Sequence, residues 1–92
     1  LYVAGANPAL KYPKAKWEAA RKNTRFLVVQ DLFLNETAAV ADLVLPTLSY
    51  VEKGGTFITI EGRLQPLLPG KEIPEGLLSD GQIFTRFAEK LN

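Results

Sequence analysis

The sequence contains no cysteine, no histidine and no methionine among its 92 residues. Without cysteine thiolates or histidine imidazoles, the chain lacks the usual ligands of zinc, iron–sulfur and haem sites. The nucleophiles and bases of cysteine-dependent and Ser-His-Asp catalysis are missing for the same reason. We therefore expect no catalytic residue, no metal ligand and no disulfide within these residues.

The sequence also has no large excess of one charge and no long apolar run. Eleven basic and ten acidic side chains leave a formal net charge of +1, so nucleic acid is not an expected partner. No apolar stretch approaches the roughly 20 residues that span a bilayer, and we expect no direct membrane insertion. The hydrophobic fraction of 47% is that of a globular domain.

The chain begins with Leu1, inside the apolar run 1–4, and has no methionine at its start. Domain boundaries are usually polar. We therefore expect residues 1–92 to form a single fragment of an α/β domain that belongs to a longer polypeptide. The absence of redox ligands then applies to the fragment alone.

The first half of the chain alternates strand and helix signals. Apolar runs at 1–4, 26–30 and 43–45 predict strands, and the unbroken run 26–30 favours a central parallel strand. Helix-forming residues at 14–22 and a capped segment at 36–41 separate these runs. This order predicts a parallel sheet whose ligands bind beyond the carboxyl ends of its strands.

The second half carries the signals of a hairpin and a helix. The segments 56–60 and 63–67 predict a β-hairpin. A loop rich in proline and glycine follows at 68–79, and the helix expected over 82–91 has Asp80 as its expected cap. The predicted fold class is a three-layer α/β fragment: a short parallel sheet, then a β-hairpin and a C-terminal helix.

Polar residues follow the first two predicted strands. Gly5 and Asn7 lie in a turn that could hold a phosphate through backbone N–H groups, or that is an ordinary strand-to-helix turn. Gln30 and Asp31 end the next strand. A carboxylate there can accept hydrogen bonds from ribose hydroxyls or a guanine edge, or can cap the following turn. Asn35 is the expected cap of the short helix.

Five motifs occur in order along nearly the whole chain, at 5–8, 26–38, 41–46, 50–57 and 61–65. This ordered series resembles the molybdopterin oxidoreductase superfamily, whose members include formate dehydrogenases, nitrate reductases and the large iron–sulfur (G-type) subunit of NADH:quinone oxidoreductase. The Glu-Gly-Arg run at 61–63 resembles the respiratory subunit. The Val-Gln-Asp run at 29–31 resembles the cofactor-binding members.

The resemblance implies two functions. The first is a fragment of the respiratory large subunit: a structural α/β domain that supports electron transfer from NADH to quinone. Its parent would carry iron–sulfur clusters. It would contact the remainder of its chain and other subunits, and lie peripherally on the cytoplasmic side of the inner membrane. The alternative is the part of a molybdenum enzyme, such as formate dehydrogenase, that holds a guanine dinucleotide.

For the alternative, the resemblance implies that five residues lie near a bound molybdopterin guanine dinucleotide. Gly5 and Asn7 would lie near its phosphates, and Gln30, Asp31 and Asn35 near its guanosine. Two positions depart from the family's pattern. Thr59 stands where relatives commonly have asparagine, and Gly81 follows Asp80 where they have tryptophan. Both departures favour a domain that has lost the cofactor.

Overall fold

The structure, a computed structural model, describes residues 1–92 and divides into two compact units. Unit 1 is Leu1–Pro46 and unit 2 is Thr47–Asn92. None of the helices combines the length and the apolar character that crossing a membrane requires.

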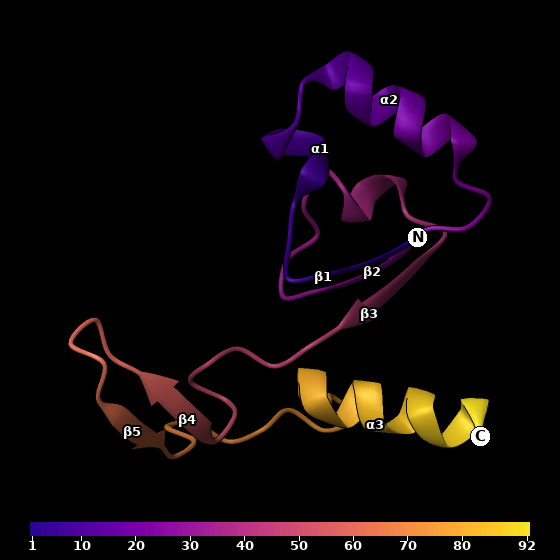
Figure 1. The fold of residues 1–92 in the computed structure, drawn as a ribbon. Helices are drawn as coiled ribbons and strands as arrows, with labels where there is room; N and C mark the ends of the chain where they lie inside the picture. The colour runs from indigo at the N-terminus through magenta and orange to yellow at the C-terminus, as the bar shows by residue number, and fades with distance from the viewer. The chain divides into compact units, whose positions relative to one another are not determined.

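Unit 1 is a three-stranded sheet with helical segments between its strands (Figure 1). Its elements are β1 (Tyr2–Ala4), α1 (Pro8–Lys11), α2 (Lys14–Asn23), β2 (Val28–Asp31), the 3-10 turn η1 (Ala38–Val40) and β3 (Leu43–Pro46). All pairings are parallel and β2 is the central strand. Ala4 is aligned with Gln30, and Gln30 with Leu45, so the loops after the strands leave from one edge of the sheet.

The core of unit 1 is formed mainly by apolar side chains of β1, β2 and η1. Leu27 and Val29 have no exposed surface, and Val3 and Ala38 complete the buried cluster. Trp17 of α2 packs against this cluster. Because burial of such side chains is the dominant favourable term in folding, this cluster holds α2 and η1 against the sheet.

Most strand and helix boundaries of unit 1 lie within one or two residues of the predicted ones, and two differences are informative. β2 begins at Val28 rather than at Phe26, whose side chain is more than half exposed. The four-residue helix α1 was not predicted, because one turn is too short to show a periodic pattern. Pro8 occupies its first turn, where a missing N–H group costs nothing.

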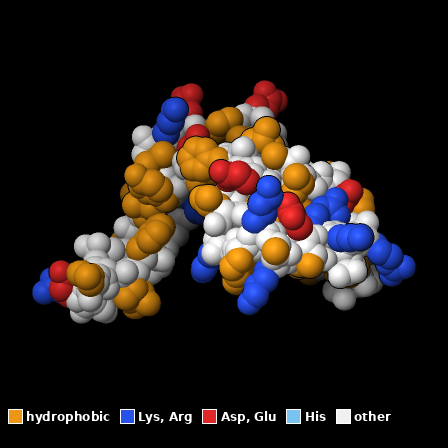
Figure 2. Space-filling view, turned by 90° about the horizontal axis from the view of Figure 1, so that it is seen from above, with side chains coloured by type: hydrophobic (Ala, Val, Ile, Leu, Met, Phe, Trp, Pro, Cys, Tyr) orange, Lys and Arg blue, Asp and Glu red, His pale blue; other side chains and the backbone are white.

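Arg21 fastens α2 to the start of β3. Its Nη2 donates to Asp42 Oδ2 at 3.1 Å, and the same carboxylate oxygen accepts from the Leu27 N–H at 2.7 Å. The Arg21 Nε also donates to the carbonyl of Val40. Lys and Arg side chains gather over the helical face of unit 1 (Figure 2), and Arg21 has a structural task there.

Unit 2 contains a hairpin and a helix: β4 (Gly55–Ile58), β5 (Leu64–Leu67) and α3 (Asp80–Leu91). β4 and β5 pair antiparallel, with Phe57 opposite Gln65. Hydrophobic side chains lie exposed along the hairpin (Figure 2), including those of Ile58 and Leu64. With unit 1, these elements confirm the predicted parallel sheet, hairpin and C-terminal helix.

The cap of α3 is Ser79, so the prediction of Asp80 as the cap is wrong. The Gln82 N–H donates to Ser79 Oγ at 3.4 Å, and the Ser79 N–H donates to Gln82 Oε1 at 2.9 Å. This reciprocal pair is a capping box. It moves Asp80 into the first turn, where its carboxylate accepts from Thr47 and Lys53 instead.

We expect Ser79→Ala to destabilise α3 by about 1 kcal/mol, because it removes the side-chain acceptor of the capping box. Amide hydrogen exchange in the first turn of the helix should accelerate accordingly. Ser79→Thr keeps an acceptor and should exchange like the parent chain. Unchanged exchange in the alanine variant would contradict the assignment of Ser79 as the cap.

Candidate nucleotide site

The candidate site of unit 1 is the edge of the sheet where β1 and β2 end. The Gly5 N–H donates to the carbonyl of Gln30 at 2.9 Å, which continues the strand pairing into the loop. Gly5 has a φ of +58°, in the left-handed region that favours glycine. A Cβ built on it would meet no atom within 4 Å. The loop, residues 5–7, therefore has open space beside Gly5.

Asp31 and Asn35 shape the second loop, residues 32–37, which follows β2. Asp31 Oδ1 accepts from the Phe33 N–H at 3.2 Å, and Oδ2 accepts from Asn35 Nδ2 at 3.0 Å. Asn35 Oδ1 in turn accepts from the N–H groups of Thr37 and Ala38. The cap of the 3-10 turn η1 is Thr37, however, so the prediction of Asn35 as the cap is wrong, although its side chain does bind the N–H groups at the start of the turn. The turn-capping alternative for Asp31 is observed.

Asp31 retains acceptor capacity. An ionised carboxylate offers about four lone-pair directions, and the two hydrogen bonds within the loop use one on each oxygen. Asp31 and Asn35 are both half-buried. A carboxylate that its own loop orients, and that still faces partly outward, can accept two further N–H or O–H donors from a ligand.

Asn7 connects the two loops. Its Nδ2 donates to Glu36 Oε2 at 2.6 Å, and its Oδ1 accepts from Thr37 Oγ1 at 2.8 Å. The Thr37 hydroxyl also accepts from the Ala9 N–H at 3.0 Å. Sequence reasoning missed Glu36 and Thr37 because these contacts join residues about 30 positions apart. Only the pairing of β1 with β2 brings them together.

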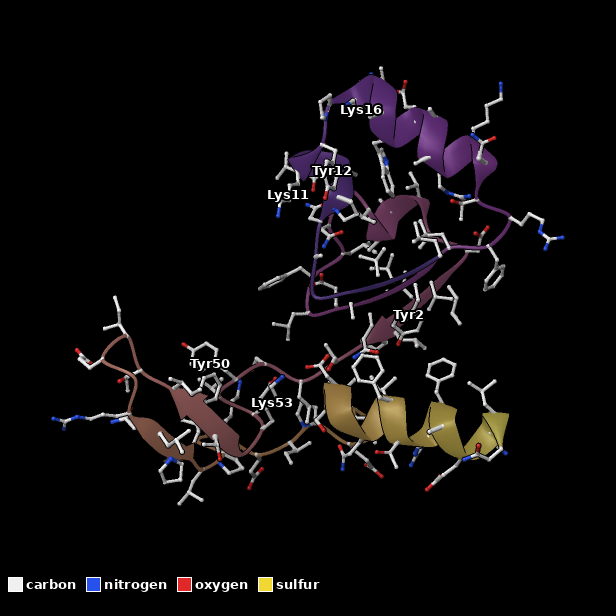
Figure 3. The ribbon with its side chains drawn as sticks, in the orientation of Figure 1. Tyr2, Lys11, Tyr12, Lys16, Tyr50 and Lys53 are labelled. Atoms are coloured by element: carbon white, nitrogen blue, oxygen red, sulfur yellow. The ribbon has the colours of Figure 1, made fainter.

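Gln30 is the predicted site residue that lies in the interior. Its side chain has no exposed surface, and its Oε1 accepts from the hydroxyl of Tyr2 on the neighbouring strand (Figure 3). The structure thus brings Gly5, Asn7, Asp31 and Asn35 to one edge of the sheet. It places the Gln30 carboxamide beneath that edge.

Hydrogen bonding lowers the pKa of Glu36. The Asn7 amide is the largest cause, and the backbone N–H of Glu36 itself adds to it. Both donors stabilise the ionised carboxylate. The loops at this edge therefore include a fixed negative charge at neutral pH, and Lys or Arg side chains take no part in the hydrogen bonds that join them.

We expect Asn7→Ala to raise the pKa of Glu36 towards its ordinary value, because the largest stabilising donor is removed. In the parent chain, the Asn7–Glu36 hydrogen bond contributes to the free energy of unfolding at a pH above the pKa of Glu36 in the unfolded state. This contribution is lost as the pH falls through the lower pKa of Glu36 in the folded state. An NMR titration of the Glu36 side-chain carboxyl measures this directly. Identical titrations in the parent and variant would refute the pairing.

Unit 2 has a polar cluster of its own. Lys53 Nζ pairs with Asp80 Oδ2 at 2.6 Å, and Thr47 Oγ1 donates to Asp80 Oδ1 at 3.0 Å (Figure 3). Ser49 donates to Glu52 and lowers the pKa of that carboxyl. No group of three or more His, Cys, Asp or Glu residues is placed to hold a metal ion. These contacts tie the segment before β4 to α3.

The fold defines the class of α/β units with a parallel sheet, in which ligands bind beyond the carboxyl ends of the strands. Comparison with known families identifies the particular one. The model of the family described as "Molybdopterin oxidoreductase" matches residues 1–90. The chain belongs to this family, as its motifs indicated.

Curated relatives include several kinds of oxidoreductase subunit. The chain is 46% identical over 92 residues to the F420-dependent formate dehydrogenase subunit alpha of Methanocaldococcus jannaschii, with 99% of the chain and 14% of that protein covered. It is 45% identical over 73 residues to a G-type subunit of the NADH-quinone oxidoreductase of Rhizobium meliloti, which covers 78% of the chain and 9% of that protein. The assimilatory nitrate reductase catalytic subunit of Bacillus subtilis is 36% identical over 92 residues, 99% of the chain and 13% of that protein.

The chain thus spans about one seventh of the length of the relatives it matches over its full extent. Formate dehydrogenase subunits and a respiratory G-type subunit are both among the relatives. These similarities therefore do not favour the respiratory subunit over the formate dehydrogenases, in contrast to the prediction from the sequence.

Proposed function

We propose that unit 1 holds the guanine-nucleotide end of a molybdopterin-type cofactor within a larger oxidoreductase subunit. One observation carries the proposal: Asp31 and Asn35 are hydrogen-bonded to each other at the carboxyl edge of the sheet, beside the open loop at Gly5. A carboxylate in that position can accept from the N1–H and N2–H groups of guanine. Adenine and cytosine offer no such pair of adjacent donors on one edge.

The residues present fit such a group. The Asp31 carboxylate supplies acceptors for the base or the ribose, and its two internal hydrogen bonds fix its direction. The N–H groups of Ala6 and Asn7 take no part in the hydrogen bonds of the loop, so they can donate to phosphate oxygens. When bound, the cofactor supplies redox chemistry at its metal, and the protein supplies binding and orientation.

The parent protein in this proposal is an oxidoreductase of the formate dehydrogenase kind, acting on formate or a comparable small substrate. The support is the similarity to formate dehydrogenase alpha subunits along 99% of the chain. Iron–sulfur clusters, the metal ligand and the partner subunits would belong to other parts of that protein. Residues 1–92 hold no redox ligand of the cysteine or histidine kind.

The second candidate is a structural domain of a respiratory G-type subunit, a domain that binds no molybdenum cofactor. Two observations favour it. Thr59 uses its hydroxyl within the hairpin, accepting from the Arg63 N–H at 3.2 Å, and Gly81 offers no side chain in the first turn of α3. Its parent would be peripheral on the cytoplasmic side of the inner membrane, supporting electron transfer from NADH to quinone with iron–sulfur clusters held elsewhere.

Calorimetric titration of the chain with GDP, ADP and CDP separates the two candidates. Nucleotide recognition through Asp31 predicts that GDP binds at least about tenfold tighter than ADP or CDP, since paired donors to a carboxylate are worth about 1–3 kcal/mol. Equal affinities for all three nucleotides, or no binding to the chain or to the full-length subunit, would support the structural domain instead.

A further inference from the structure

We propose that Thr37 is a positioning residue for this site: its buried hydroxyl holds the loop at residues 5–7 in the shape that receives the nucleotide phosphates. The inference rests on the proposed function and assigns a task to a residue that touches no ligand. It also assigns the Asn7 carboxamide to holding the loop, and the Asn7 backbone N–H to the ligand.

The hydroxyl of Thr37 makes two contacts of opposite polarity. It accepts from the Ala9 N–H at 3.0 Å and donates to Asn7 Oδ1 at 2.8 Å. Thr37 has no exposed surface. A hydroxyl can donate once and accept twice, so this one group satisfies polar atoms on both sides of Pro8. The loop is thereby held at its far end, while Gly5 holds it at the strand.

Thr37 is also bound to the loop that would receive the guanosine. Its N–H donates to Asn35 Oδ1 at 3.1 Å, and Asn35 Nδ2 donates to Asp31. A series of hydrogen bonds therefore connects Asp31, the proposed guanine acceptor, through Asn35 and Thr37 to the loop at residues 5–7. Removing the Thr37 hydroxyl breaks the hydrogen bonds between Thr37 and that loop and leaves the Asp31–Asn35 hydrogen bond intact.

Asn7 has both ends of its carboxamide engaged. Oδ1 accepts from Thr37 and Nδ2 donates to Glu36 at 2.6 Å. The carboxamide is thus committed to holding the loop, and the backbone N–H groups of Ala6 and Asn7 are the donors that the loop can offer. Their directions depend on the loop's shape, which the Thr37 hydroxyl fixes.

The test compares GDP with guanosine, because the two ligands differ only in the phosphates. Thr37→Val keeps the side-chain shape and removes the hydroxyl. We expect it to weaken GDP binding about tenfold, the equivalent of one lost hydrogen bond, while the affinity for guanosine changes less than about twofold. Thr37→Ser restores the hydroxyl and should recover most of the affinity for GDP.

A second variant keeps the test valid if Thr37→Val does not fold. Asn7→Ala removes the acceptor of the same contact from a half-buried position and should also lower the affinity for GDP without changing that for guanosine. Amide exchange of Ala9 provides a readout independent of ligands: it should accelerate in Thr37→Val, whereas that of Phe33 should not. A merely structural threonine would lower both affinities together.

The outcomes distinguish the inference from the function on which it rests. If the parent chain prefers GDP to guanosine and Thr37→Val keeps that ratio, the positioning role is overturned and the nucleotide site stands. Failure of serine to restore the ratio also overturns it. If the parent chain and the full-length subunit bind neither GDP nor guanosine, the proposed function fails and the positioning role fails with it.

Discussion

Asp31→Ala should reduce the affinity of the chain for GDP by about 100-fold. The variant removes the acceptor of the paired guanine donors, and each good bidentate pair contributes about 1–3 kcal/mol of discrimination. It also removes the acceptor of the Phe33 backbone N–H and of the Asn35 side-chain amide, two contacts that shape the loop. Isothermal titration with GDP measures the affinity, and parallel titration with ADP shows whether the base preference is lost.

Two variants control this prediction. Asp31→Asn keeps one oxygen, which can still accept from the Phe33 N–H, but it loses the acceptor of the Asn35 side-chain amide and cannot accept from both guanine donors. The preference for GDP over ADP should therefore be lost. Glu18→Ala removes an exposed carboxylate of α2, which pairs with Lys14 at 3.8 Å, and should bind GDP like the parent chain. If Asp31→Asn binds GDP within about threefold of the parent, Asp31 does not read the base.

Leu27→Ala should destabilise unit 1 by about 3 kcal/mol. The Leu27 side chain has no exposed surface and packs in the cluster with Val3 and Val29. Truncating a buried leucine costs the transfer free energy of the lost methyl groups together with the free energy of the cavity left behind, about 2–5 kcal/mol in all. Urea unfolding followed by NMR signals of β2 measures the change in the free energy of unfolding.

The matched control is Leu10→Ala, because Leu10 belongs to α1 in the same unit and is 72% exposed. Its effect should stay within about 0.5 kcal/mol, the usual range for exposed positions. Equal destabilisation by the two variants would mean that the cluster around Leu27 is not the core of unit 1.

The parallel sheet was predictable because each of its strands has a local signal. The unbroken apolar run that contains Leu27 and Val29 requires cover on both sides, and this run became the central strand. Because the strands are parallel, the loops that follow them lie at one edge of the sheet. The sequence could therefore predict that Gly5, Asp31 and Asn35 lie near one another. The contacts of the Asn35 side chain with the following turn were predictable because they involve only the next three residues, although the cap of η1 is Thr37.

The contacts that organise the site were not predictable from local patterns. Thr37 and Glu36 contact Asn7 across about 30 residues of sequence, and their identities alone suggest only a helix start. Gln30 was expected near the guanosine because of its place at the end of the strand and because of the family resemblance. In the structure, its carboxamide is buried, and Oε1 accepts from the hydroxyl of Tyr2, a partner that only strand pairing supplies.

The cofactor content of the full-length subunit that contains this chain tests the central claim most directly. The subunit is purified intact, its molybdenum and tungsten are quantified, and the nucleotide released by acid hydrolysis is identified by chromatography. Our account predicts one equivalent or more of molybdenum or tungsten together with guanine nucleotide, and loss of both in the Asp31→Ala subunit. A folded, intact subunit with neither metal nor guanine nucleotide would contradict it.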